Sequence, residues 1–108
     1  MKRGTVVWVN LEDVHPPEFG KTRLAVLVSN TEQNNVLDSV VVVPLSSRAP
    51  AIWPLRLAMP AVGKLAHSFA ITPGIRQVAK RRLMRAEGVV SQGAMDALTA
   101  AFDAYLSD

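Results

Sequence analysis

Short apolar runs, separated by polar segments that contain proline or glycine, make up the chain as far as residue 90. Runs of this length with such punctuation predict β-strands. Four consecutive valines at residues 40–43 predict a central strand that is buried on both faces. The predicted strands cover residues 4–11, 24–29, 36–45, 54–58, 63–71, 75–78 and 87–90. Residues 12–22 predict a loop, residues 30–35 a loop or a single helical turn, and residues 72–74 a turn.

The chain after residue 90 carries a helical pattern instead. Ser91 can cap the free amides of a first turn. Apolar side chains then recur at helical spacing, namely Met95, Leu98, Phe102, Tyr105 and Leu106. Several short strands followed by one helix predict a mainly β fold, a small curved β-barrel with a C-terminal helix packed on it. We expect a single domain over residues 1–108.

Composition narrows the class of protein. The sequence has no cysteine, which excludes disulfides and thiolate metal sites. The apolar run after Arg3 ends at Asn10 and is shorter than the roughly 7–15 residues of a signal-peptide core. No apolar run approaches the ~20 residues of a membrane span. We therefore expect a soluble cytoplasmic protein that does not associate with a membrane.

The charge is unevenly distributed. The net charge is only +3, but the interval from Ser39 to Ala86 contains no acidic residue. It holds eight of the chain's twelve Lys and Arg side chains: Arg48, Arg56, Lys64, Arg76, Lys80, Arg81, Arg82 and Arg85. Such a one-signed interval predicts a polyanionic partner such as nucleic acid, although a solvated basic face without a ligand remains the alternative.

Three segments carry candidate chemistry. Residues 18–30 read Glu-Phe-Gly-Lys-Thr-Arg-Leu-Ala-Val-Leu-Val-Ser-Asn, a polar loop that runs directly into an apolar strand. Residues 44–47 read Pro-Leu-Ser-Ser, and residues 75–83 read Ile-Arg-Gln-Val-Ala-Lys-Arg-Arg-Leu. In this order they resemble the MazF/PemK/Kid toxins, the metal-independent mRNA interferases of bacterial toxin–antitoxin pairs. The resemblance implies an SH3-like barrel and a sequence-specific endoribonuclease that cuts single-stranded mRNA, leaving a 2′,3′-cyclic phosphate and a 5′-hydroxyl.

The resemblance places the family's catalytic arginine on Arg23. A guanidinium stays charged and can form two parallel bonds to phosphate oxygens, which suits it to stabilise charge rather than to move protons. The alternative is a surface arginine that pairs with Glu18. Ser46 matches the family's strand-end hydroxyl and can donate to the phosphate, or it can simply satisfy backbone groups. Ser47 would replace Ser46 if the strand register slipped by one residue.

Proton transfer and RNA binding have further candidates. Glu18 is the best candidate base, and His15 titrates near neutrality, although both can be ordinary loop residues. His67 lies in an apolar stretch, and we expect it to be structural. Trp53 can stack on a base or can cover the end of the barrel. The cations expected to bind RNA are Lys21, Arg76, Lys80, Arg81 and Arg82.

The chain also departs from the family. Leu24 stands where the family usually has proline, and Ala79 replaces a common aspartate. Motifs for nucleotide cofactors or metals are missing, so we expect no cofactor and no metal. Two alternatives stay open: a CcdB-type toxin of the same fold, which poisons DNA gyrase, and an RNA-binding barrel that has lost catalysis.

Two partners besides RNA are expected. The segment at residues 49–62 is apolar and broken by prolines, and we expect it to expose more apolar surface than a monomer tolerates, which favours a homodimer. The alternative is that its apolar side chains fill the barrel, which would account for about half of them. The acid-free interval favours inhibition by a small antitoxin whose acidic, disordered tail folds on binding.

Overall fold

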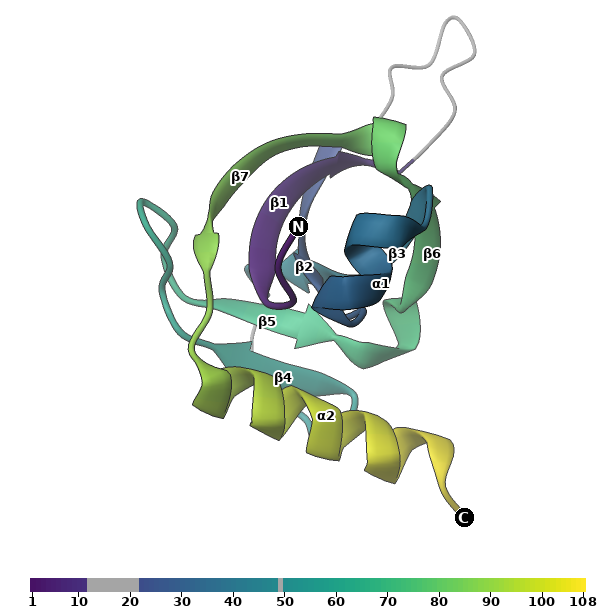
Figure 1. Ribbon diagram of the computed structural model, residues 1–108. Coiled ribbons are helices and arrows are strands. Elements are labelled where there is room, and N and C mark those ends of the chain that lie inside the picture. The colour runs from purple at the N-terminus through teal and green to yellow at the C-terminus, as the bar shows by residue number, and fades with distance from the viewer. Residues whose placement is uncertain (12–21, 49) are drawn as a thin grey trace, which may run out of the picture.

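The computed structural model describes residues 1–11, 22–48 and 50–108, in which a strongly curved sheet is followed by a helix (Figure 1). The strands are β1 (Thr5–Asn10), β2 (Thr22–Leu27), β3 (Ser39–Ser46), β4 (Arg56–Met59), β5 (Ser68–Ile71), β6 (Arg76–Ala79) and β7 (Leu83–Val89). The helices are α1 (Thr31–Val36) and α2 (Gln92–Leu106), and two short 3₁₀ turns are η1 (Thr72–Gly74) and η2 (Lys80–Arg82).

The sheet is antiparallel throughout, with strand order β4-β5-β3-β2-β1-β7 and with β6 paired to β3 beside this path. β3 is therefore central, since it pairs with β2, β5 and β6. Val40, Val42 and Val43 are buried on it, which confirms the predicted central strand. Figure 1 shows β1, β7 and β6 curving around a common interior. The predicted class, a mainly β SH3-like barrel with a C-terminal helix, is confirmed.

Successive side chains of a strand point to opposite faces of the sheet, so the buried side chains form two clusters. One cluster lies within the curve of the sheet and contains Val7, Val9, Ala25, Leu27, Val40, Val42 and Val78. The other joins the opposite face of the sheet to α2 and contains Val6, Val26, Val43, Met59, Ala70, Val90, Met95 and Leu98. Because β1, β2 and β3 are packed on both faces, side chains at the ends of these strands are held in fixed positions.

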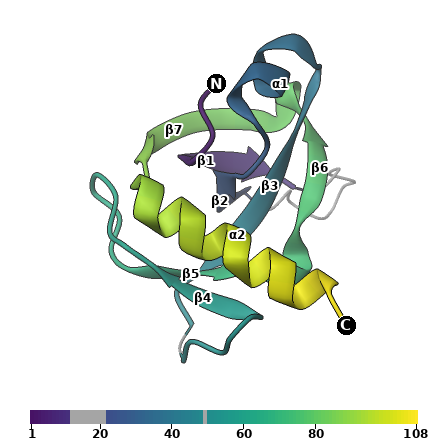
Figure 2. The same ribbon diagram turned by 60° about the horizontal axis from the view of Figure 1, so that its bottom comes forward.

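The C-terminal helix begins where the sequence predicts. The Ser91 Oγ accepts a hydrogen bond of 3.2 Å from the Ala94 amide, so Ser91 is the N-cap. Figure 2 shows α2 lying across the molecule next to β4 and β5. Met95 and Leu98 are buried, but Tyr105 and Leu106 at the far end remain exposed. In the described part of the chain, neither helix has the length and apolar character needed to span a membrane.

Several predicted boundaries were wrong. The strand predicted at residues 63–71 begins only at Ser68, because Gly63 adopts a φ of +57° in a tight turn that brings Val62 opposite Leu65. The strand predicted at residues 87–90 begins at Leu83. Two register shifts against β1 interrupt the alternation of inward and outward side chains along it. The predicted strand at residues 54–58 is shifted to Arg56–Met59. For residues 30–35 the helical alternative was right, since Asn30 caps the short helix α1.

Candidate nucleic-acid interface

Arg23 and Ser46 lie on neighbouring strands at one rim of the barrel. Val9 pairs with Arg23, and Ala25 pairs with Pro44. The pairing of β2 with β3 ends at Ala25 and Pro44, so Arg23 and Ser46 each lie two residues beyond it, on neighbouring strands and toward the same rim. Arg23 is exposed, and its guanidinium has no hydrogen bond or ion pair to any residue that the structure describes. An open cation and a hydroxyl therefore lie near the same end of these two strands.

The end of β3 borders a hollow of about 180 Å³. Its lining comprises Leu24 and Leu45, the hydroxyl residues Ser46 and Ser47, and the segment that leads into β5, namely Leu65, Ala66, His67 and Ser68. The Ser46 Oγ accepts a hydrogen bond of 3.1 Å from the Arg48 amide, which leaves its own proton available for a ligand. Ser46 and Ser47 therefore reach the same hollow, although they face opposite ways along an ideal strand.

His67 is the site residue that the sequence prediction misplaced. We expected a structural histidine inside an apolar strand, but the chain turns at residues 62–65 and His67 precedes β5. His67 is exposed and lines the same hollow as Ser46 and Ser47. The hollow therefore combines serine hydroxyl groups with an imidazole.

The predicted cationic residues fall into two places. η2 carries Lys80, Arg81 and Arg82, and the Arg82 Nη1 donates to the Asn10 carbonyl at 3.3 Å. Leu83, the residue after η2, pairs with Val9, and Val9 also pairs with Arg23. Leu83 therefore lies about two strand spacings, roughly 10 Å, from Arg23, and η2 directly precedes it.

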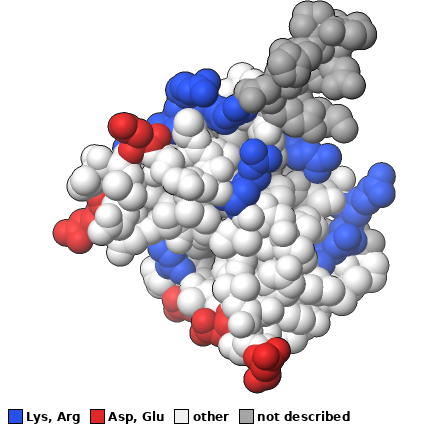
Figure 3. Space-filling model, turned by 90° about the vertical axis from the view of Figure 1, so that its right-hand side faces the viewer, with Lys and Arg blue, Asp and Glu red and all other residues white. Residues whose placement is uncertain are grey.

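Arg76 is more distant from Ser46. It is exposed on β6 opposite Val42, about 13 Å along β3 from Ser46. Figure 3 shows Lys and Arg side chains gathered on the upper part of one face, with Asp and Glu towards its left and lower margins.

The predicted apolar segment is exposed in part. Trp53 is 57% exposed, Ile52 47% and Leu55 42%, whereas Met59 is buried at 3%. The exposure of Trp53 favours a free aromatic surface over a lid that covers the barrel end. The prediction that this segment exposes apolar side chains agrees with these values for Ile52, Trp53 and Leu55, whereas Met59 is part of the core.

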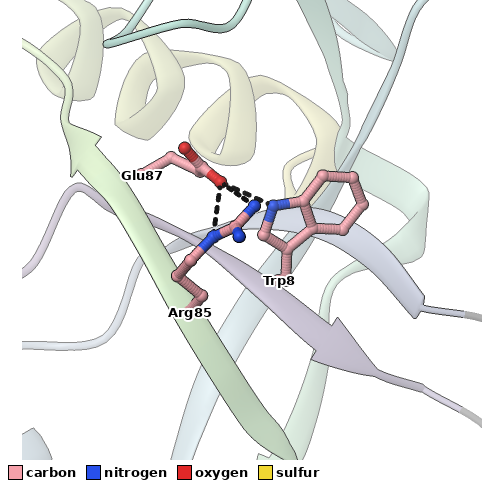
Figure 4. Close-up of polar contacts among 3 residues, drawn as sticks. All are labelled: Trp8, Arg85 and Glu87. Carbon is pink, nitrogen blue, oxygen red and sulfur yellow. Dashed lines mark hydrogen bonds and ion pairs between the residues drawn. The ribbon is translucent and has the colours of Figure 1, made fainter.

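A polar cluster that the sequence analysis did not single out joins β1 to β7. The Trp8 Nε1 donates to the Glu87 Oε1 at 2.8 Å, and the Arg85 Nε and Nη2 donate to the same oxygen at 3.0 and 2.8 Å (Figure 4). The bonds from Trp8 and Arg85 lower the pKa of Glu87 below its ordinary value. Beside this cluster is a hollow of about 310 Å³ that is lined by Trp8, Thr22, Met84 and Arg85.

Three predicted residues, His15, Glu18 and Lys21, lie outside the residues that the structure describes. Among the described residues, no group of three or more His, Cys, Asp and Glu side chains is arranged to hold a metal ion. The described candidates therefore comprise the Arg23–Ser46 pair, the hollow with His67, the cations of η2 and the cluster around Trp8.

Residues 2–106 match the family model described as "PemK-like, MazF-like toxin of type II toxin-antitoxin system". Among solved structures, one is an endoribonuclease in complex with its cognate antitoxin from a mycobacterial species, with 24% identity and a TM-score of 0.81 over 98% of this chain and 94% of that chain.

Two further structures are similar. A MazE–MazF structure from Deinococcus radiodurans has 20% identity and a TM-score of 0.83 over 98% of this chain and 95% of that chain. The Mycobacterium tuberculosis toxin MazF-mt6 has 16% identity and a TM-score of 0.77, covering 96% of this chain and 98% of that chain. At these identities the structural similarity establishes a common fold.

Proposed function

The chain belongs to the PemK-like and MazF-like toxins of type II toxin–antitoxin systems, and on this premise we propose that it is a sequence-specific, metal-independent endoribonuclease that cleaves single-stranded mRNA. The observation that carries the proposal is the exposed Arg23 guanidinium on β2, next to the end of β3 that carries Ser46, with η2 and its cations ending at Leu83, two strands away from Arg23. Two solved structures of similar fold that are described as endoribonucleases support the proposed activity.

The proposed reaction is an internal transfer at one phosphate. The 2′-oxygen of the nucleotide before the cut loses its proton and bonds to phosphorus, while the bond from phosphorus to the 5′-oxygen of the next nucleotide breaks. The leaving 5′-oxygen takes up a proton, so the products are a 2′,3′-cyclic phosphate and a 5′-hydroxyl. Arg23 binds the non-bridging oxygens as their charge grows, and Ser46 donates a hydrogen bond to one of them.

Two protons must move during this transfer, and Arg23 is unsuited to move them because guanidinium does not deprotonate in proteins. Glu18 is our proposed base, and His15 assists in RNA binding. His67 is positioned to serve as the partner acid, since it lines the hollow that Ser46 and Ser47 share.

RNA binding is assigned to the remaining predicted residues. Lys80, Arg81 and Arg82 contact phosphates, which sets the position of the strand without reading its sequence. We also assign Lys21 and Arg76 to phosphate binding, as the sequence predicts. Ser47 lines the hollow beside the reacting phosphate, and the exposed Trp53 provides a surface on which a base can stack.

We propose two protein partners for this single domain. The exposed Ile52, Trp53 and Leu55 form an apolar area that a second copy can cover in a homodimer. The cognate antitoxin would place an acidic, disordered tail over the cations of the acid-free interval. Because the proposed substrate is mRNA, we propose that the toxin acts in the cytoplasm. Light scattering at micromolar concentration tests the dimer, and a monomer of 11.7 kDa would contradict it.

The deciding experiment is digestion of a mixed single-stranded RNA in excess EDTA, with DNA of the same sequence as the control. We expect RNA fragments that end in cyclic phosphate by mass spectrometry, and intact DNA, because only RNA has the attacking 2′-hydroxyl. Cleavage that stops on chelation refutes metal independence. Intact RNA together with trapped gyrase–DNA complexes would instead establish the CcdB-type alternative, and RNA that binds without being cut would establish a non-catalytic barrel.

A further inference from the structure

The hollow beside Trp8, which we name the Trp8 pocket, is bounded by Trp8, Thr22, Met84 and Arg85 and has a volume of about 310 Å³. The Trp8 indole is half-buried, whereas Met84 is 61% exposed and the Arg85 side chain 75%. The pocket thus combines a flat aromatic surface, a polarizable thioether and a cation. These are chemical features that suit a flat, electron-rich ring attached to an anionic backbone.

The aromatic wall of this pocket is fixed before any ligand arrives. Glu87 Oε1 accepts hydrogen bonds from the Trp8 Nε1 and from two nitrogens of Arg85, as Figure 4 shows. Glu87 is itself only 15% exposed, and its own strand supplies Arg85 two residues earlier. A ring held in this way loses little conformational freedom when a ligand stacks on it.

The pocket borders the strand that carries Arg23, although Thr22 and Arg23 point to opposite faces of β2. Thr22, which lines the pocket, directly precedes Arg23, so their Cα atoms are about 3.8 Å apart. Trp8 pairs with Leu24, and Leu24 also lines the hollow that contains Ser46, Ser47 and His67. A nucleotide strand that places a phosphate at Arg23 therefore has the Trp8 pocket within the reach of a neighbouring base.

We propose that the Trp8 pocket binds one nucleobase of the RNA substrate next to the cleaved phosphate, with the base stacked on Trp8 and the adjoining phosphate contacted by Arg85. This inference rests on the proposed function and adds a specific subsite to it. Glu87 acts as a positioning residue through Trp8 and Arg85, since it does not itself line the pocket.

The test is a double-mutant cycle between protein and RNA. The probe is the RNA oligonucleotide that spans the mapped cleavage site, with 2′-deoxyribose at the cut nucleotide so that it binds without being cleaved. Each base next to the cut is removed in turn, and binding to the wild type and to Trp8→Ala is measured by fluorescence anisotropy. We expect one abasic position to weaken wild-type binding about 10- to 100-fold, the range of base–aromatic stacking, and to weaken Trp8→Ala binding less than twofold.

Conservative variants separate stacking from folding. Trp8→Phe keeps an aromatic face but cannot donate to Glu87, so it should retain part of the coupling to the same base. Glu87→Gln keeps an acceptor for the Trp8 Nε1 and should bind RNA better than Glu87→Ala. Tyr105→Ala removes a comparably exposed aromatic residue on α2 and should show no coupling to any base.

The outcomes distinguish the two levels of the proposal. If the protein cuts RNA but the effects of Trp8→Ala and every abasic position simply add, the Trp8 pocket is not a base site and the proposed function stands. A protein that neither cuts nor binds RNA overturns the proposed function and this site together. If Trp8→Ala instead halves the mass in light scattering, this face is a contact between subunits, which also overturns the proposal.

Discussion

Replacing Arg23 tests the centre of the proposed mechanism. The guanidinium is exposed and has no partner among the described residues, so Arg23→Ala leaves no buried group unpaired there. The free energy of unfolding should change by less than about 0.5 kcal/mol, as for other exposed substitutions. Catalysis should suffer far more, because the cation is placed to stabilise charge that develops only during the reaction. Loss of one such donor lowers kcat about 10²- to 10³-fold, or roughly 2.7–4 kcal/mol.

Single-turnover cleavage at saturating protein measures this effect on the chemical step, and binding of the 2′-deoxy oligonucleotide measures the ground state. Arg23→Lys keeps the charge but loses the two parallel bonds, so it should recover only part of the rate. Lys2→Ala removes an exposed cation elsewhere and provides the control.

Three results would refute this reasoning. A rate for Arg23→Ala within a few-fold of wild type would remove Arg23 from the chemistry. If RNA binding weakens by as much as the overall cleavage efficiency falls, Arg23 binds the substrate and the transition state equally well and does not accelerate the chemical step. A fall in the melting temperature of more than about 8 °C would show that the arginine is structural.

Four further substitutions test other parts of the structure. Arg81→Gln should weaken RNA binding and reduce the salt dependence by about 0.7 logarithmic units, the value for one phosphate contact on a single strand; an unchanged slope would exclude that contact. The lowered pKa of Glu87 means that its stabilisation is present above the ordinary glutamate pKa and is lost as the pH falls through the lowered value. Glu87→Gln should therefore lose less unfolding free energy than wild type on acidification, as measured by urea titrations. Gly63→Ala should destabilise by at least ~1–2 kcal/mol, because φ is +57° and the new Cβ would lie 2.6 Å from the Glu87 carbonyl oxygen. Gly93→Ala has open space around the new Cβ inside α2 and should stabilise by up to ~1 kcal/mol, so equal effects of the two glycine substitutions would contradict the local geometry.

The fold was largely predictable because its strongest signals are local. The valine run of β3 and the Ser91 cap of α2 need no knowledge of distant residues. β7 was predicted too short for a physical reason. It is an edge strand with mostly exposed side chains, and its two register shifts against β1 break the alternation that a sequence pattern detects.

The site was predictable in part. Arg23 and Ser46 were proposed individually from the sequence, but only the pairing of β2 with β3 shows that they lie on neighbouring strands. The Trp8–Glu87 bond joins residues 79 positions apart, and no periodicity connects them. His67 was misjudged because an apolar neighbourhood in sequence does not distinguish a strand interior from a tight turn. Gly63 was the available signal, since glycine marks positions where the chain can turn with positive φ.

The two departures from the family pattern have different consequences once the strands are paired. Ala79 pairs with Ser39 at the start of β3, about 23 Å along that strand from Ser46. The missing aspartate therefore lies beside the cations of η2, where it would affect how RNA is bound rather than the charge at the cleaved phosphate. Leu24 is half-buried and pairs with Trp8, between the hollow that holds His67 and the Trp8 pocket. A leucine at that position supplies an apolar side chain between two proposed RNA subsites and leaves the adjacent Arg23 exposed.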